Sequence, residues 1–169
     1  MAASADIDSI TGATAITLPD IRWQRCDIKT TSLISNVWLR QQAIAEGASE
    51  AILVRDGEVT EGAATNVFIV IDDTVLTPPH SHKLLPGVTR DLIVELLRNR
   101  GIKHEETFFT LAQMRVAQEV WLSSSTKELI PVVEIDGAKV ATGRPGENFT
   151  KVHALFQEYK ADCRAGKVA

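Results

Sequence analysis

The chain has 169 residues, of which 24% are charged and 44% hydrophobic, and its formal net charge is −4. This length suits one domain or the larger half of a two-domain enzyme, and it can bury a core without covalent staples. The mild negative charge without a basic patch argues against nucleic-acid binding, and no apolar run is long enough to cross a membrane.

The first half of the chain predicts mostly strands. In chain order, the pattern indicates a loosely ordered segment over 1–12, a strand over 13–18, a helix over 33–46, and strands over 51–54, 66–71 and 74–77. The helix is predicted because Ile34, Val37, Trp38 and Ile44 recur at helical spacing before Gly47. Turn signals separate the strands, and residues 59–66 predict a turn of small residues.

The second half predicts shorter elements in alternation. In chain order they are a helix over 89–99, a strand over 103–109, a short helix after the capping box of Thr110 and Gln113, strands over 119–123 and 130–135, and a final helix after Gly146. Asp136-Gly137 marks a hairpin between strands. Strands outnumber helices and hairpins are frequent, so we expect an α+β domain with a mixed sheet.

The cysteines and histidines indicate neither disulfides nor a metal. Cys26 and Cys163 have no ligand or disulfide spacing, and the N-terminus lacks the basic start and apolar stretch of a secretory signal. We therefore expect reduced thiols and a cytoplasmic protein. The two histidines of segment 79–82 lack cysteine or acidic partners nearby in the sequence, so we expect no metal site.

Two residues could carry cofactor chemistry. Lys29 ends the run Arg22-Trp23-Gln24-Arg25-Cys26-Asp27-Ile28-Lys29, and a lysine in an apolar neighbourhood is a candidate for forming a Schiff base. Glu61 lies in the run from Thr60 to Asn66, before an apolar strand. A buried carboxylate there could hold the proton of a pyridine nitrogen, and such pairing would depress the pKa of Glu61.

Two segments could hold a phosphate. Gly87-Val88-Thr89-Arg90 opens a helix, where free backbone N–H groups and the helix dipole favour an anion. Four hydroxyl side chains follow an apolar strand at 123–126 and offer further donors.

These four segments, in this order and spacing, resemble the fold-type IV pyridoxal-5′-phosphate (PLP) enzymes, most closely the D-amino-acid aminotransferase branch. The resemblance runs from about residue 13 to about residue 159, and Thr126 to Pro131 adds to it. It implies the larger, C-terminal, cofactor-binding domain of that fold over 13–169, with a barrel-like mixed sheet and flanking helices. It also implies that the family's small N-terminal domain does not precede this region.

The resemblance assigns roles to eight residues. Lys29 would hold PLP and move the proton between the substrate and the cofactor, and Glu61 would pair with the ring nitrogen. The remaining cofactor contacts would come from Arg22 near the ring hydroxyl, Leu85 on the ring face, and Val88, Thr89, Ser124 and Ser125 at the phosphate.

The activity implied is amino-group exchange between a D-amino acid of the D-alanine type and a 2-oxo acid such as 2-oxoglutarate, in a homodimer. Three alternatives stay open: a branched-chain L-amino-acid aminotransferase, an aminodeoxychorismate lyase, and a non-catalytic remnant. The D-amino-acid enzyme and the two alternative enzymes would use the same lysine and glutamate. Because substrate recognition would lie largely in the missing domain, we expect this chain alone to be inactive.

Overall fold

A mixed sheet forms the framework of the protein. The computed structural model describes residues 12–167, so the loosely ordered segment expected at the N-terminus lies almost wholly outside the described residues. The strands are β1 (Ala13–Pro19), β2 (Glu50–Arg55), β3 (Glu58–Gly62), β4 (Asn66–Ile71), β5 (Thr74–Thr77), β6 (His104–Glu106), β7 (Glu119–Ser124), β8 (Glu128–Ile135) and β9 (Ala138–Lys139). Their order is β3-β2-β1-β8-β7-β4-β5-β6, with β9 beside β8.

The sheet is mixed and curled. β1 runs parallel to both β2 and β8, and β5 runs parallel to β6, while the other pairs are antiparallel. After β6 the chain returns to β3, the strand at the opposite edge of the sheet. There the Val59 N–H of β3 donates a hydrogen bond to the Phe109 carbonyl at 3.0 Å. The expected α+β class with a barrel-like mixed sheet is confirmed.

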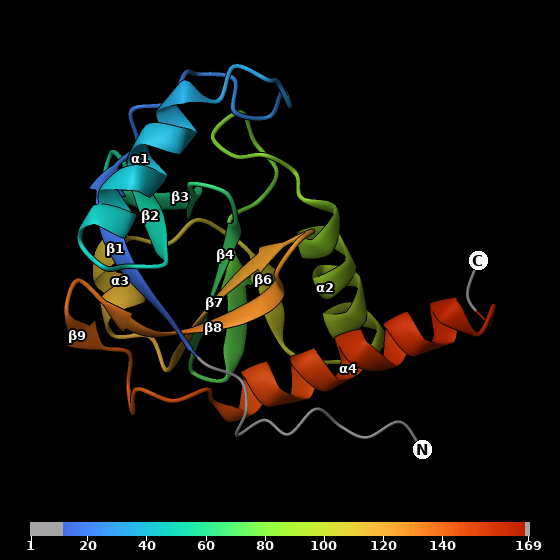
Figure 1. Cartoon of the computed structure of the whole chain (residues 1–169). Helices are drawn as coiled ribbons and strands as arrows, with labels where there is room; N and C mark the ends of the chain where they lie inside the picture. Colours follow the sequence, from blue (N-terminus) through green and yellow to red (C-terminus); the bar gives the residue numbers. More distant parts are fainter. Residues whose placement is uncertain (1–11, 168–169) are drawn as a thin grey trace.

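Helices cover the sheet from two sides. They are α1 (Ile34–Ala45), α2 (Val88–Asn99), α3 (Leu111–Arg115) and α4 (Glu147–Arg164). In Figure 1, α1 lies beside the β1–β3 end, whereas α2 and α4 lie together at the other side. The predicted capping box is confirmed, because the Thr110 side chain accepts from the Gln113 N–H at 3.2 Å. No helix between residues 12 and 167 has the length and apolar composition to cross a bilayer.

The core lies on both faces of the central strands because their side chains alternate. On β4 and β7, Val67 and Leu122 point to one apolar cluster, while Phe68 and Trp121 point to the other, under α2 and α4. The Trp121 ring lies edge-on to Phe149 of α4, with the ring centres 6.0 Å apart. This double-sided burial fixes the ends of β4 and β7, from which the candidate site is built.

Three expectations need correction. Residues 58–62 form β3 rather than a turn, because the Asp56-Gly57 hairpin pairs them with β2. Of the strand predicted over 103–109, only residues 104–106 form a strand, β6. It lies at the edge of the sheet and pairs with β5 alone. The apolar stripe that predicts α1 is exposed: Ile34 is 82% and Trp38 61% exposed, while the helix is held by Leu39 and Ala43.

Candidate functional site

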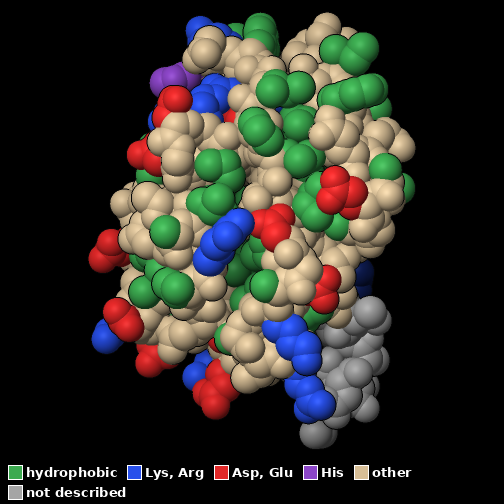
Figure 2. Space-filling view, turned by 90° about the vertical axis from the view of Figure 1, so that its left-hand side faces the viewer, with side chains coloured by type: hydrophobic (Ala, Val, Ile, Leu, Met, Phe, Trp, Pro, Cys, Tyr) green, Lys and Arg blue, Asp and Glu red, His purple; other side chains and the backbone are tan. Residues whose placement is uncertain are grey.

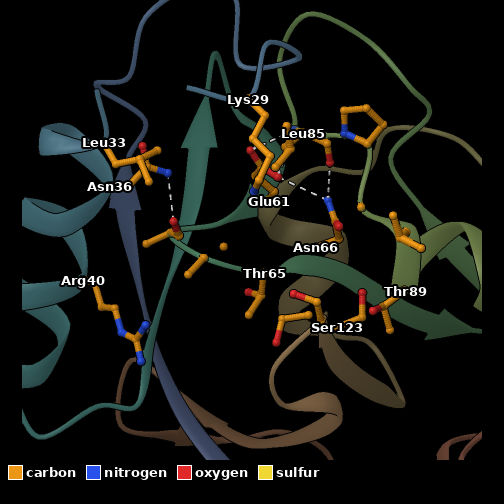
Figure 3. Close-up of a pocket in the computed structure, with 18 of the residues that line it drawn as sticks. Lys29, Leu33, Asn36, Arg40, Glu61, Thr65, Asn66, Leu85, Thr89 and Ser123 are labelled. Atoms are coloured by element: carbon orange, nitrogen blue, oxygen red, sulfur yellow. Dashed lines mark hydrogen bonds between the residues drawn. The ribbon is translucent and has the colours of Figure 1, made fainter. Parts of the chain in front are cut away.

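A cavity of about 630 Å³ opens where four segments far apart in the sequence meet. Its walls come from the loop before α1 and the first half of α1, the β3–β4 connection, the segment that enters α2, and the end of β7 (Figure 3). The volume is within the range of sites for small organic ligands, about 300–1,000 Å³.

The structure brings the predicted site residues together. Seven of the eight line this cavity: Lys29, Glu61, Leu85, Val88, Thr89, Ser124 and Ser125. Arg22 instead lines an adjoining cavity of about 60 Å³, whose walls also include Lys29, Glu61 and Leu85. The two cavities therefore share three of the residues to which the resemblance assigns contact with PLP.

Lys29 lies in the loop between β1 and α1, and its side chain extends toward Glu61 and Leu85 (Figure 3). The sequence led us to expect an apolar surrounding for this amine, but Lys29 is exposed. The loop is placed by contacts on either side of the lysine. The Cys26 N–H donates to the His82 carbonyl at 2.9 Å, and the Asn36 amide of α1 donates to the Ala63 carbonyl at 2.8 Å.

Glu61 is a buried carboxylate at the end of β3, with 5% of its surface exposed. It accepts hydrogen bonds from the Arg22 guanidinium, from the Leu85 N–H at 3.1 Å, and from the Asn66 amide at 3.2 Å. Burial raises the pKa of Glu61 to about 7, although Arg22 and the Leu85 N–H act in the opposite direction. In the protein alone, desolvation outweighs the effect of one cation; the expected depression of this pKa assumes a pyridine nitrogen beside Glu61 and stays a prediction.

Arg22 holds Glu61 within a buried ion network. Its guanidinium also binds Asp20 at 2.9 Å and donates to the Lys83 carbonyl at 3.2 Å, and Arg55 binds Asp20 at 3.0 Å. Burial would raise the pKa of Asp20, but the hydrogen bond and the charge of Arg22 lower it overall. Burial likewise opposes the charge of Arg22, but Asp20 and Glu61 raise the pKa of its guanidinium overall. The network therefore keeps Arg22 charged beside Glu61.

Asn66, the first residue of β4, links Glu61 to the segment that enters α2. Its amide donates to Glu61 and also to the Leu85 carbonyl at 2.9 Å (Figure 3). Gly87 packs closely against it: a Cβ atom on Gly87 would lie 2.1 Å from the Asn66 Oδ1. The glycine thus allows the N-terminus of α2 to approach the strand that carries the acid.

The opposite part of the cavity offers hydrogen-bond donors. Gly87 is the N-cap of α2, and no side chain accepts a hydrogen bond from the first N–H groups of that helix. The Ser123 hydroxyl, on a residue only 1% exposed, also has no partner among the described residues. Free helix N–H groups beside an unpaired buried hydroxyl are suited to an oxyanion. Among residues 12–167 no group of three or more His, Cys, Asp or Glu is placed to hold a metal ion.

Sequence reasoning missed three residues of this site. Asn66 was within a quoted motif but had no role assigned, and Asn36 and Arg40 were not considered. Asn36 and Arg40 lie on α1, the helix that follows the Lys29 loop, and they are one helical turn apart. Helical spacing could therefore have placed both on the side of the cavity.

Comparisons with known proteins identify relatives of the chain. The sequence model of the family described as "Amino-transferase class IV" matches residues 3–135. Proteins named D-alanine aminotransferase from Listeria monocytogenes and Bacillus licheniformis are 41% and 40% identical over 149 and 146 residues. These matches cover 88% and 86% of this chain and 52% of each relative, so the chain spans about half their length.

Solved structures share the fold. A branched-chain amino acid aminotransferase from T.th., complexed with N-(5′-phosphopyridoxyl)-L-glutamate, has a TM-score of 0.81 at 26% identity, covering 93% of this chain and 53% of that one. An aminotransferase from Brucella abortus bound to PLP has a TM-score of 0.79 at 26% identity, covering 89% and 55%.

Proposed function

The chain belongs to the class IV aminotransferase family. We propose that it is the PLP-holding part of an enzyme that moves an amino group between a D-amino acid of the D-alanine type and a 2-oxo acid such as 2-oxoglutarate. The observation that carries the proposal is the cavity in which Lys29, Glu61 and the N-terminus of α2 meet. The D-alanine aminotransferases at about 40% identity support the choice of substrate class.

The residues that line the cavity could hold each part of the cofactor. The unpaired hydroxyl of Ser123, with Ser124, Ser125 and the N–H groups at Val88 and Thr89, would hold the phosphate, since a dianion gains from several donors. Leu85 offers an apolar surface for the ring. When bound, PLP supplies an electron sink for the electron pair left at the substrate Cα after a proton departs.

The side chains of this chain would supply the proton chemistry. The Lys29 amine would hold the cofactor at its aldehyde carbon, C4′, until the amino group of the substrate displaces it. The freed amine would then move the proton between the substrate Cα and C4′. The Glu61 carboxylate would hold a proton at the ring nitrogen, and Arg22, near the ring hydroxyl, would keep that carboxylate in place.

A second candidate, exchange of branched-chain L-amino acids, is supported by the likeness to branched-chain aminotransferases. The Escherichia coli enzyme has a TM-score of 0.77 at 29% identity, covering 87% of this chain and 51% of that one.

We also propose a homodimer in the cytoplasm. Figure 2 shows hydrophobic side chains gathered over the upper part of the face that carries α1, where a second protein surface could cover them. Both cysteines are free, Cys26 buried and Cys163 exposed, which agrees with a reducing compartment.

The test is chemical labelling of the lysine. The chain is loaded with PLP, treated with borohydride, digested and analysed by mass spectrometry. We expect the cofactor to be fixed on the peptide that contains Lys29. The Lys29→Ala variant should lose both the label and the absorbance of the lysine-bound cofactor. The control Lys103→Ala, which removes an exposed lysine outside the cavity, should keep both. Label on another lysine would overturn the assignment. Comparing D-alanine with L-leucine as amino donor to the complete enzyme then separates the two candidates.

A further inference from the structure

Arg40 is a charged residue in the wall of the cavity, and it has no role in the proposed chemistry. It lies on α1, is half-buried, and lines the cavity together with Leu33 and Val37 of the same helix side. In Figure 3 Arg40 enters from the α1 side, whereas Thr89 lies at the opposite side of the view, beyond Thr65 and Ser123.

The other charged residues that line the cavity already have partners or a proposed role. Asp27 binds Arg25 at 2.8 Å, Glu61 binds Arg22, and Lys29 is the proposed cofactor lysine. Arg40 alone among these four has neither a role in that chemistry nor a hydrogen bond or ion pair to any described residue.

One acidic side chain is near enough to influence Arg40 but does not bind it. Burial raises the pKa of Glu50, and Arg40 and Lys127 oppose that rise, although neither forms an ion pair with it. The Glu50 carboxylate instead accepts from the Ala51 N–H at 3.0 Å. The guanidinium of Arg40 is therefore available to a ligand in the cavity.

A guanidinium beside apolar walls favours one chemical group. Its planar set of N–H donors matches the two oxygens of a carboxylate, and Arg40 is itself half-buried in the cavity wall. The donors at Val88, Thr89 and Ser123 form a separate anion-binding end, across the cavity from Arg40. The cavity thus offers groups suited to an anion at two separate places.

We propose that Arg40 binds a carboxylate of the amino-acid or 2-oxo-acid substrate, at the end of the cavity opposite the N-terminus of α2. The proposal rests on the proposed function, since the phosphate of PLP would occupy the other end. The carboxylate is either the one that every substrate carries or the second one of a dicarboxylic substrate such as 2-oxoglutarate.

The experiment uses two unreactive acids, glutarate with two carboxylates and butyrate with one. Each is titrated into the 169-residue chain with and without PLP, and dissociation constants are taken from NMR shifts, including those of arginine side-chain N–H groups. The variants are Arg40→Gln, Arg40→Lys, and Arg144→Gln as a charge-matched control, because Arg144 does not line the cavity. Thermal unfolding and PLP absorbance of every variant are recorded in parallel.

We expect Arg40→Gln to weaken glutarate binding about tenfold or more, the cost of losing a charged hydrogen-bond pair. Arg40→Lys should lose less, and Arg144→Gln should match the wild type. If butyrate weakens equally, Arg40 holds the shared carboxylate; if only glutarate weakens, it holds the second.

Equal affinities of wild type and Arg40→Gln for both acids would overturn the proposal. A loss of affinity in Arg40→Gln would also overturn it if the variant unfolds at a lower temperature and its affinity is fully recovered well below that temperature. Failure of the wild-type chain to bind PLP would instead contradict the proposed function, because the acid titrations without PLP still report on Arg40.

Discussion

Glu61 is the site residue whose pKa is shifted by its surroundings into the physiological range. It is buried beside Arg22, accepts from the Leu85 N–H and the Asn66 amide, and its pKa is raised to about 7. A carboxyl group with this pKa changes its charge in the physiological pH range. A cation brought next to it, such as a protonated pyridine nitrogen, would therefore favour its ionised form and lower that pKa.

The raised pKa of Glu61 predicts a pH-dependent stability. The folded protein binds this proton more tightly than the unfolded chain, whose ordinary value is 4.5, so the free energy of unfolding should fall as the pH rises from about 4.5 through about 7. Glu61→Gln removes that titration. Compared with wild type without PLP, the variant should gain stability between pH 4.5 and 8, on the order of 1–3 kcal/mol.

Urea unfolding of both proteins at several pH values measures this difference. Glu58→Gln serves as the control, because Glu58 is on the same strand but is only partly buried and pairs with Lys83. A constant difference between Glu61→Gln and wild type from about pH 4.5 to about pH 8 would show that the carboxyl keeps its ordinary pKa.

At this scale the sequence predicted which residues meet but not how they interact. Seven of the eight predicted residues line one cavity, as the resemblance of their motifs to one enzyme family had implied. The links of Arg22 to Glu61 and of Asn66 to Leu85 cross 39 and 19 residues of chain. The direction of the Glu61 pKa depends on burial that only the folded strands create, so no local pattern could have predicted it.

The junction of β4 and α2 shows how two elements define the site. Gly87 begins α2 against Asn66 at the start of β4, and Asn66 in turn holds Glu61 and the Leu85 carbonyl. The N-terminus of the helix and the acid of β3 are thereby held at a fixed separation. Since both would contact one rigid cofactor, this separation matters for binding.

Gly87→Ala tests that junction. The new Cβ would lie 2.1 Å from the Asn66 Oδ1, and Asn66 is too buried to move freely, so its hydrogen bonds to Glu61 and Leu85 should break. We expect a loss of about 1–3 kcal/mol in the free energy of unfolding and about tenfold weaker PLP binding by fluorescence titration.

Gly146→Ala is a matched control. Gly146 is the N-cap of α4, where a Cβ would also lie close to a side chain, that of Glu119, but it does not line the cavity. It should destabilise the fold without changing PLP affinity. Equal loss of PLP affinity in both variants would mean that affinity follows stability rather than the junction.

Among the elements, those fixed by local chemistry were predicted best. Asp56-Gly57 and Asp136-Gly137 have the positive φ angles of tight hairpin turns, which their side chains tolerate, so the sequence marks them directly. β3 was missed because its polar residues become a strand only through pairing with β2. The periodicity of α1 predicted a helix correctly, but periodicity does not say which face the rest of the fold covers.

The whole molecule has an apolar face beside the cavity. The exposed large hydrophobic residues on α1 and the loop before it are Ile21, Trp23, Ile28, Leu33, Ile34, Val37, Trp38 and Ile44. Their exposed fractions range from 45% to 82%, and such a concentration on one surface is typical of an interaction site.

The chain should therefore self-associate through this face. Sedimentation velocity at increasing concentration should detect a dimer or larger species, and Trp38→Lys should shift the distribution toward monomer. Val116→Lys is the control, because Val116 is 79% exposed but follows α3 and is part of neither α1 nor the loop before it. A wild-type chain that stays monomeric at high concentration would contradict the assignment of this face.

The isolated chain should bind PLP but transaminate poorly. Catalysis requires the substrate to be held at a fixed angle to the ring, and positioning supplies much of the rate. The chain spans about half the length of its relatives, and its cavity is open beside the exposed face. With D-alanine, PLP and 2-oxoglutarate, we expect less than about 1% of the turnover of the complete Bacillus licheniformis relative. Comparable turnover would place all substrate-binding groups in this chain.

The position of β1 between β2 and β8 also governs how the molecule is made. β2 is synthesised soon after β1, but β8 follows so late that Thr17 of β1 and its partner Asp136 are 119 residues apart. At about 5–20 residues per second, ribosomes need on the order of 10 s to bridge that interval. During this time one edge of β1 has no strand to pair with, and an open edge is where nascent chains mispair. The pairing of β1 at the centre of the sheet is thus completed only after β8 has been synthesised.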